Sequence, residues 1–275
     1  SAQWEAYRAV NAQFAHVVSR VAGPHDLVWL HDYHLMLLPS MLRQREPRLR
    51  IGWYLHTPWP ALEVFRTLPM RRDILRGLLS ADVLGFHIYE YSRHFLHACT
   101  QLLGAEVALE GRHLSWDVKS ADGATTLRHS LNVEAVPIGI DPGRFRAALR
   151  SAATRARVAE LRKRFENVHV MLGVDRMDYI KGIPHKLIAL EKFLHAYPAW
   201  AHKIMLVQIA TPPKKDTARY QKLRNKVHKL VGRINGRFGT LEHAPIHYLD
   251  QPINSIELVA LYFLADVCLI SSLRE

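Results

Sequence analysis

Five short apolar runs, each followed by a polar or charged cluster, limit the folds open to this chain. Uninterrupted apolar runs of this length are typical of strands in a parallel sheet. Because ligands bind beyond the carboxyl ends of such strands, the clusters are candidate site residues. The runs and clusters are Leu27–Leu30 with His31–His34, Ile51–Leu55 with His56–Pro60, Val168–Val174 with Asp175–Gly182, Ile204–Ala210 with Thr211–Asp216, and Val267–Ile270 with Ser271–Glu275.

Segments with helical spacing separate these strands, so the chain is predicted to form doubly wound α/β units. In the first half we expect helices at about 4–18, 35–46, 71–80 and 88–103, strands at about 27–30, 51–55, 82–86 and 133–136, and a hairpin turn at Asp122–Gly123. In the second half we expect helices at about 154–165, 184–197, 216–237 and 254–264, and strands at about 168–174, 203–210, 245–249 and 266–270.

The segment Pro137–Pro142 interrupts this alternation and is the predicted domain boundary. It divides the chain into lobes 1–140 and 141–275, both Rossmann-like. Two such lobes joined by a short link are expected to face each other across a cleft. This arrangement is similar to the GT-B fold of nucleotide-sugar transferases.

Composition narrows the class of protein. No apolar run approaches the roughly 20 residues of a membrane span, and the first residues lack the order of a signal peptide. Cys99 and Cys268, the two cysteines, form no disulfide framework and no metal motif, so we expect a soluble cytoplasmic protein. The absence of an initial Met, and an end directly after a predicted strand, predict a piece of a longer protein.

The formal net charge of +12 favours an anionic partner. The basic residues are spread over predicted helix surfaces without the interleaved aromatic residues that stack on bases. We therefore expect a small phosphorylated substrate and neither nucleic acid nor a membrane as partner.

The segment Arg176–Gly182 is the sharpest local signal for an anion site. It ends a predicted strand, and Pro184 suits the first turn of the helix that follows. An Arg fork and a Lys point charge together suit a diphosphate. The alternative is an ordinary surface loop in which Arg176 pairs with Asp175 or Asp178.

His56 and Asp32 are the candidates in the first lobe. His56 lies in a loop stiffened by two prolines, although a histidine at a strand end is often structural. Asp32 is flanked by His31 and His34, which is too little for a metal-ligand set. We interpret Asp32 as a sugar-binding carboxylate. No partner carboxylate follows it, which argues against a double-displacement glycosidase.

Eight segments together resemble the trehalose-6-phosphate synthase family, in order and with compatible spacing from Trp4 to the last residue. They are His31–Leu35, Tyr54–Pro60, Phe65–Pro69, Ala81–His87, Pro137–Asp141, Gly173–Gly182, Gly232–Gly236 and Ser272–Glu275. The resemblance implies a UDP-glucose-dependent glycosyltransferase of trehalose biosynthesis. It would make α,α-trehalose 6-phosphate and UDP from UDP-glucose and glucose 6-phosphate, with retention and without a metal or other cofactor.

The same resemblance implies roles for single residues. Lobe 1–140 would bind the acceptor and lobe 141–275 the nucleotide sugar. Arg176 and Lys181 would hold the donor diphosphate and stabilise the leaving UDP. The remaining residues with implied roles are His56 at the transferred glucose, Asp32 at the acceptor sugar, Lys214 at the acceptor phosphate, and Ile253, Leu258 and Glu275 at the donor.

Two residues depart from the family pattern and keep an alternative open. Lys214 replaces an Arg, and Glu275 replaces an Asp. They are compatible with a catalytically weak, synthase-like regulatory subunit that binds sugar phosphates. A transferase with another acceptor, such as glycogen, fits the fold but not the segment around Asp32. Homo-oligomers and a fused phosphatase domain both remain open for the full protein, and the piece alone is expected to be inactive.

Overall fold

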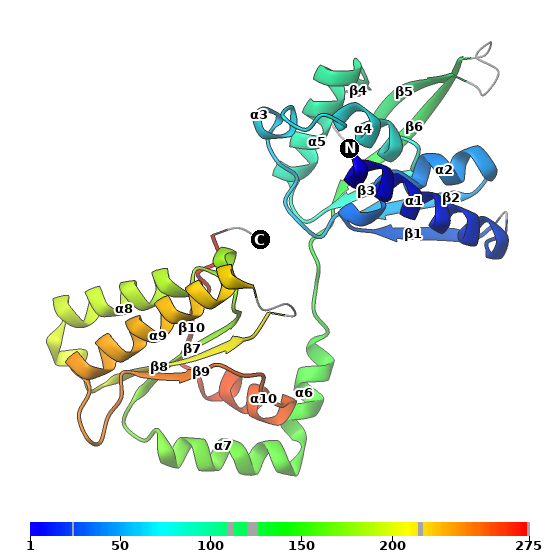
Figure 1. Ribbon diagram of the computed structural model, residues 1–275. Helices are drawn as coiled ribbons and strands as arrows, with labels where there is room; N and C mark the ends of the chain where they lie inside the picture. The colour runs from blue at the N-terminus through cyan, green and yellow to red at the C-terminus, as the bar shows by residue number, and fades with distance from the viewer. Residues whose placement is uncertain (24, 109–112, 120–125, 214–216, 274–275) are drawn as a thin grey trace. The chain divides into compact units, whose positions relative to one another are not determined.

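The computed structural model describes residues 1–275 except 24, 109–112, 120–125, 214–216 and 274–275 (Figure 1). The chain forms two compact units, Ser1–Gly139 and Ile140–Glu275. The division lies one residue before the boundary predicted from the sequence. Each unit has its own hydrophobic core, with one cluster of buried side chains in the first and two in the second.

The first unit is built on a six-stranded mixed sheet with strand order β1-β2-β3-β6-β5-β4. The first four strands of that order are parallel, whereas β5 and β4 extend the sheet with antiparallel pairing. Its elements are α1 Ala2–Val21, β1 Leu27–His31, the 3-10 helix η1 Tyr33–Leu35, α2 Leu38–Arg45, β2 Arg50–Tyr54, α3 Leu62–Phe65, α4 Arg71–Leu78, β3 Val83–Phe86, α5 Tyr89–Leu103, β4 Glu106–Val107, β5 His113–Lys119 and β6 Thr126–Ala135.

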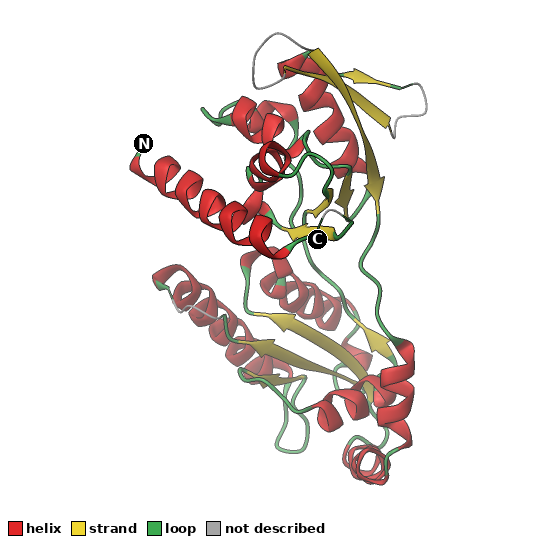
Figure 2. Ribbon diagram, turned by 90° about the vertical axis from the view of Figure 1, so that its right-hand side faces the viewer, coloured by secondary structure: helices red, strands yellow, loops and turns green. Residues whose placement is uncertain are grey.

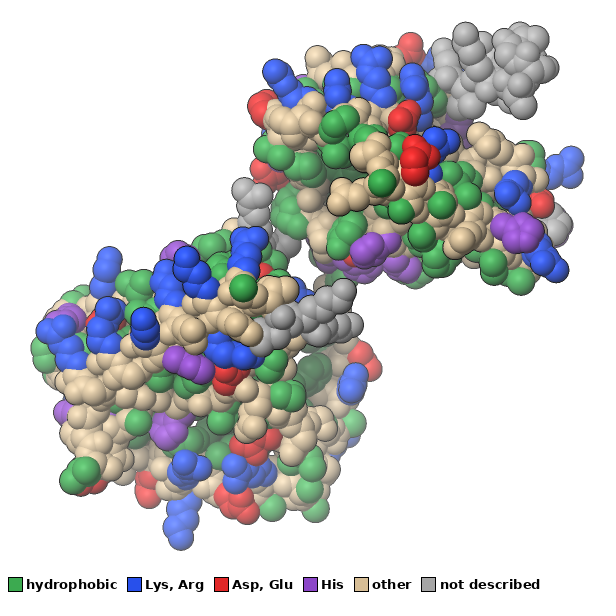
Figure 3. Space-filling model, viewed as in Figure 1, with side chains coloured by type: hydrophobic (Ala, Val, Ile, Leu, Met, Phe, Trp, Pro, Cys, Tyr) green, Lys and Arg blue, Asp and Glu red, His purple; other side chains and the backbone are tan. Residues whose placement is uncertain are grey.

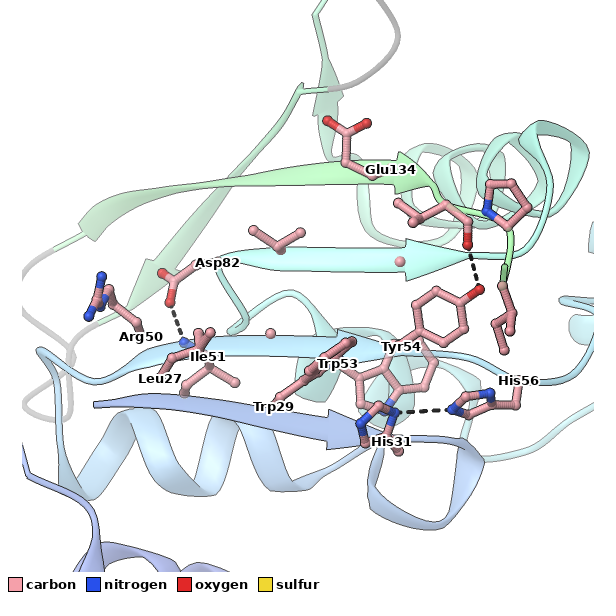
Figure 4. A pocket seen from close by; sticks show the side chains of 16 residues that line it. Leu27, Trp29, His31, Arg50, Ile51, Trp53, Tyr54, His56, Asp82 and Glu134 are labelled. Carbon is pink, nitrogen blue, oxygen red and sulfur yellow. Dashed lines mark hydrogen bonds between the residues drawn. The ribbon is translucent and has the colours of Figure 1, made fainter. Parts of the chain in front are cut away.

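The parallel strands of this sheet bury one face and expose the other. Because successive strand residues point to opposite faces, Trp53 is 1% exposed in the core while Trp29 is 63% exposed. The single core cluster places the helices of the described part on the buried face. The opposite face forms a groove of about 720 Å³ (Figure 4). His31 and His56 line it at the carboxyl ends of β1 and β2, and Arg50 and Asp82 line its opposite end.

The second unit is a four-stranded parallel sheet with order β10-β7-β8-β9. Helices lie on both of its faces (Figure 2). Its elements are α6 Pro142–Arg150, α7 Ala152–Arg164, β7 His169–Arg176, η2 Tyr179–Lys181, α8 Ile183–Ala196, η3 Pro198–Trp200, β8 Ile204–Thr211, α9 Ala218–Phe238, β9 Ile246–Leu249, α10 Ser255–Leu264 and β10 Val267–Cys268.

Strand β8 shows how the sequence produces these two layers. Leu206 and Ala210 pack in the cluster formed with α8 and α9, while Val207 and Ile209 pack in the cluster formed with α7 and α10. Every residue from Ile204 to Ala210 is therefore buried, which explains why the run is apolar at every position except Gln208. The predicted doubly wound α/β class is confirmed here.

The structure moves several predicted element ends. The helix expected at 35–46 begins at Leu38, and a turn of 3-10 helix precedes it. The strand expected at 133–136 is the end of the longer β6, and the one at 266–270 shrinks to Val267–Cys268, since only those residues pair with β7. Helix α6 was not predicted. The expected turn at Asp122–Gly123 lies outside the described residues.

No helix in the described ranges has the length and apolar character needed to cross a membrane.

Candidate active site

The two first-unit candidates lie at one edge of the sheet. Asp32 directly follows β1 and His56 comes two residues after β2, and these strands are parallel neighbours with His31 beside Tyr54. The expectation that strand ends collect polar side chains is therefore met on this edge (Figure 4).

Asp32 has a backbone conformation that residues other than glycine rarely adopt, with φ 69° and ψ 175°. Three hydrogen bonds hold it there. Its N–H donates to the Tyr54 carbonyl at 2.7 Å, and its own carbonyl accepts from Trp53 Nε1 at 3.1 Å and from the Leu35 N–H at 3.4 Å. Its Oδ1 is buried without a hydrogen-bond partner. A strained backbone and an unsatisfied carboxylate oxygen are features of a ligand-binding position.

His56 lies among other aromatic rings. Its Nε2 is 3.0 Å from His31 Nδ1, and its ring centroid is 4.9 Å from the ring of Tyr54 and 6.0 Å from that of His87. The Tyr54 hydroxyl donates to the Val136 carbonyl at 2.6 Å, and burial raises the pKa of that hydroxyl above its ordinary value. The ring that lies beside His56 is thus anchored to the end of β6.

Gly85 makes room for this ring. A Cβ at Gly85 would come within 2.5 Å of Tyr54 Cδ2, so any larger residue at position 85 would displace the Tyr54 ring. Because the hydroxyl has one hydrogen, which goes to Val136, its 3.3 Å contact with His87 Nδ1 requires that nitrogen to donate. The tautomer of His87 follows from this count.

Arg176 and Lys181 lie at the carboxyl end of β7 in the second unit. Arg176 is the last residue of β7, and its Nη2 donates to Asp178 Oδ2 at 3.0 Å, which is one of the pairings left open by the sequence. The Arg176 side chain remains 57% exposed. Lys181 ends the 3-10 turn and is half-buried.

Gly182 allows the turn into α8. It has φ 64°, and a Cβ there would come within 2.1 Å of the Ser271 carbonyl oxygen. The Ser271 hydroxyl donates to the Lys181 carbonyl at 3.0 Å, and the Leu273 N–H donates to the Ile180 carbonyl at 2.6 Å. The residues after β10 therefore hold the cationic loop.

Asp175 belongs to the support of this loop. Its Oδ2 accepts from Lys186 Nζ at 2.7 Å and from Gln208 Nε2 at 2.9 Å, and the Lys186 side chain is 2% exposed. This buried pair ties the end of β7 to α8. The predicted alternative partner of Arg176, Asp175, is occupied elsewhere.

The remaining candidates are less defined by the structure. Ile253 is half-buried just before α10, and the Leu258 N–H donates to the Asn254 carbonyl within the helix. Lys214 and Glu275 lie outside the described residues.

Charge differs between the two candidate regions. Lys and Arg side chains gather over α8 and α9 of the second unit (Figure 3), among them Lys222, Lys226 and Lys229 on the exposed face of α9. Such a field favours anions. The edge holding Asp32 and His56 instead offers a carboxylate and imidazoles, which can form hydrogen bonds with sugar hydroxyls.

The described residues also bear on metal binding. No cluster of three or more His, Cys, Asp or Glu in the described ranges is placed to hold a metal ion.

Three residues at this edge were missed from the sequence. Tyr54 and His87 were not singled out, and His31 was noted only as a neighbour of Asp32. One pattern in the sequence could have found them. β1, β2 and β3 follow one another along the chain as apolar runs, so the polar residues after these strands could be expected to lie together.

The sequence profile of glycosyltransferase family 20 matches residues 1–275. The α,α-trehalose-phosphate synthase [UDP-forming] 1 of Aspergillus fumigatus is 46% identical over 276 residues, which are 99% of this chain and 51% of that protein. This chain thus spans about half the length of that curated relative.

Two solved structures are similar throughout the chain. A structure titled as trehalose-6-phosphate from E. coli bound with UDP-2-fluoro glucose has a TM-score of 0.88 and 31% identity, over 99% of this chain and 58% of that one. The N-terminal domain of the trehalose-6-phosphate phosphatase of Candida albicans has a TM-score of 0.87 and 33% identity, over 98% and 55%. With the profile match over its full extent, this chain belongs to glycosyltransferase family 20.

Proposed function

We propose that the full-length protein transfers glucose from UDP-glucose to glucose 6-phosphate, releasing α,α-trehalose 6-phosphate and UDP. The bond between C1 of glucose and the UDP oxygen breaks, and a bond from C1 to the acceptor O1 forms. The acceptor hydroxyl proton passes to the departing phosphate. Departure and attack on the same face retain the configuration at C1.

The cationic loop of the second unit would bind the donor. Arg176 offers the guanidinium nitrogens not engaged by Asp178, and Lys181 adds a point charge five residues later. Fixed positive charge at the leaving diphosphate stabilises the transition state electrostatically. We therefore propose a reaction without a metal. Ile253, Leu258 and Glu275 would contact the rest of the donor.

The edge of the first unit would bind the sugars. Asp32, with its buried and unpartnered Oδ1, would accept hydrogen bonds from acceptor hydroxyls, and His56 would contact the transferred glucose. Lys214 would contact the acceptor phosphate. The observation that carries the proposal is the 46% identity, across 99% of this chain, to a protein named as a UDP-forming trehalose-phosphate synthase.

The test is a synthase assay on the full-length protein. Purified protein with UDP-glucose and glucose 6-phosphate should release UDP and trehalose 6-phosphate, and EDTA should leave the rate unchanged because Arg176 and Lys181 supply the charge. Activity abolished by EDTA and restored by magnesium would overturn the metal-free part. No product under any condition would overturn the reaction.

A second candidate function is regulatory binding of sugar phosphates without turnover. The similar Candida albicans structure is named for a phosphatase, so this fold also occurs in a protein with another name. Calorimetric binding of UDP-glucose and glucose 6-phosphate with no product would favour this candidate. Binding accompanied by turnover would exclude it.

A further inference from the structure

We propose that His31 is a positioning residue for His56, which it holds through a hydrogen bond between the two imidazoles. The kinetic part of this inference rests on the proposed function. The bond joins His31 Nδ1 and His56 Nε2 at 3.0 Å, a normal hydrogen-bond distance (Figure 4).

The topology makes this contact a consequence of strand pairing. His31 is the last residue of β1 and pairs with Tyr54 at the end of β2, so His56 continues beyond the pair on the same edge. Because residues i and i+2 of a strand share a face, His31 lies on the same face as Trp29, and their ring centroids are 4.8 Å apart. The His31 ring is thus supported from one side by Trp29 while it faces His56.

His56 is held from its other side as well. The ring of Tyr54 lies 4.9 Å from that of His56, and its hydroxyl is anchored on the Val136 carbonyl. Both supports restrict the rotation of the His56 ring. An exposed histidine in a loop would otherwise sample several rotamers, which a group contacting a reacting sugar must not do.

The hydrogen bond also decides which nitrogen of His56 meets the ligand. One of the two facing nitrogens must carry a hydrogen and the other a lone pair. In either arrangement Nε2 of His56 is engaged by His31, and Nδ1 is the ring nitrogen left for the transferred glucose. His31 thus orients the His56 ring and couples the tautomers of the two imidazoles, because a hydrogen on one of the facing nitrogens requires a lone pair on the other.

Two substitutions separate the hydrogen bond from packing. His31→Phe keeps a ring against Trp29 but has no nitrogen, whereas His31→Gln keeps an amide that can donate or accept. Since His31 is exposed, both variants should fold. His16→Gln, an exposed histidine on α1, is the control for loss of a surface imidazole.

The first readout needs no substrate. Long-range ¹H–¹⁵N spectra of the ligand-free full-length protein report the tautomer of each histidine, and His56→Asn assigns the His56 signals. We expect the tautomer populations of His56 to change in His31→Phe, which has no nitrogen to couple to, and to stay closer to those of the wild type in His31→Gln. An unchanged His56 spectrum in His31→Phe would overturn the proposal.

The second readout is the synthase assay. In His31→Phe we expect kcat to fall about 10- to 100-fold, the cost of a misplaced contact, with the KM for glucose 6-phosphate unchanged and most activity recovered in His31→Gln. Equal kcat in His31→Phe and wild type would overturn the positioning role. A wild type that makes no product while His31→Phe alters the His56 spectrum would refute the proposed function and leave the contact established.

Discussion

At the scale of single residues, Asp32 combines a strained backbone with a buried carboxylate oxygen that has no hydrogen-bond partner. Asp32 lies at φ 69° and ψ 175°, a backbone region that costs residues other than glycine about 1–3 kcal/mol. The three backbone hydrogen bonds to Tyr54, Trp53 and Leu35 compensate for that cost. The geometry therefore favours glycine for stability, and the Asp32 side chain is the group that the proposed acceptor site would use.

Comparing Gly with Ala at position 32 measures this strain. Both substitutions remove the carboxylate, and only Ala keeps the Cβ. We expect Asp32→Gly to be more stable than Asp32→Ala by about 1–2 kcal/mol in urea unfolding. At Gln13, exposed within α1, the order should reverse, with Ala favoured by about 1 kcal/mol. Ala equal to or better than Gly at both positions would show that Asp32 is unstrained.

The proposed donor site gives a second prediction at this scale. In the full-length protein, Arg176→Ala and Lys181→Ala should each lower kcat/KM by about 100-fold or more, as removal of one preorganised charge at a leaving group does. Lys192→Ala, which removes an exposed charge from α8, should leave kcat/KM unchanged. A change limited to the KM for glucose 6-phosphate would place Arg176 and Lys181 at the acceptor instead.

At the scale of elements, the loop between β7 and α8 joins two parts of the second unit. Gly182 gives it a left-handed turn, and the segment after β10 holds it through Ser271. Beneath it, the buried Asp175–Lys186 pair connects β7 to α8. The position of Lys181 is thus determined from both sides.

Gly182→Ala tests this coupling. The added Cβ would meet the Ser271 carbonyl oxygen at 2.1 Å and would strain the backbone at φ 64°, so we expect a loss of at least about 2 kcal/mol in unfolding free energy. Gly232→Ala is the matched control, because nothing lies within 4 Å of a Cβ there and α9 should gain about 0.5–1 kcal/mol. Both variants are measured by urea titration, and shifts in the same direction would refute the argument.

What the sequence predicted well at this scale are strands and the residues at their ends. Apolar runs gave β1, β2, β7 and β8, because burial on both faces or on one leaves a direct trace in composition. The contact between His31 and His56 left no such trace. It depends on strand register and on side-chain rotamers, which no local pattern records. Which of Asp175 and Asp178 pairs with Arg176 likewise could not be read from the sequence. It depends on Lys186 and Gln208, which bind the Asp175 carboxylate.

At the scale of the whole molecule, the chain has separate cores on either side of one short link. Among the described residues, buried side chains of the first unit form one cluster, and those of the second form two. The link is exposed, with Val136 at 52%, Ile138 at 60% and Ile140 at 76%. Separate cores favour separate unfolding, since cooperativity depends on shared buried contacts.

Two core substitutions test this independence in the 275-residue chain. Leu84 in β3 and Leu206 in β8 are each 0% exposed, and truncation of a buried Leu costs about 2–5 kcal/mol through lost burial and a cavity. Scanning calorimetry of the chain should resolve two transitions. Leu84→Ala should lower the midpoint of one and Leu206→Ala that of the other, each leaving its counterpart within a degree or so. If both substitutions lowered one common transition, the two cores would unfold together, and binding of a ligand to either unit would stabilise the entire chain rather than its own unit.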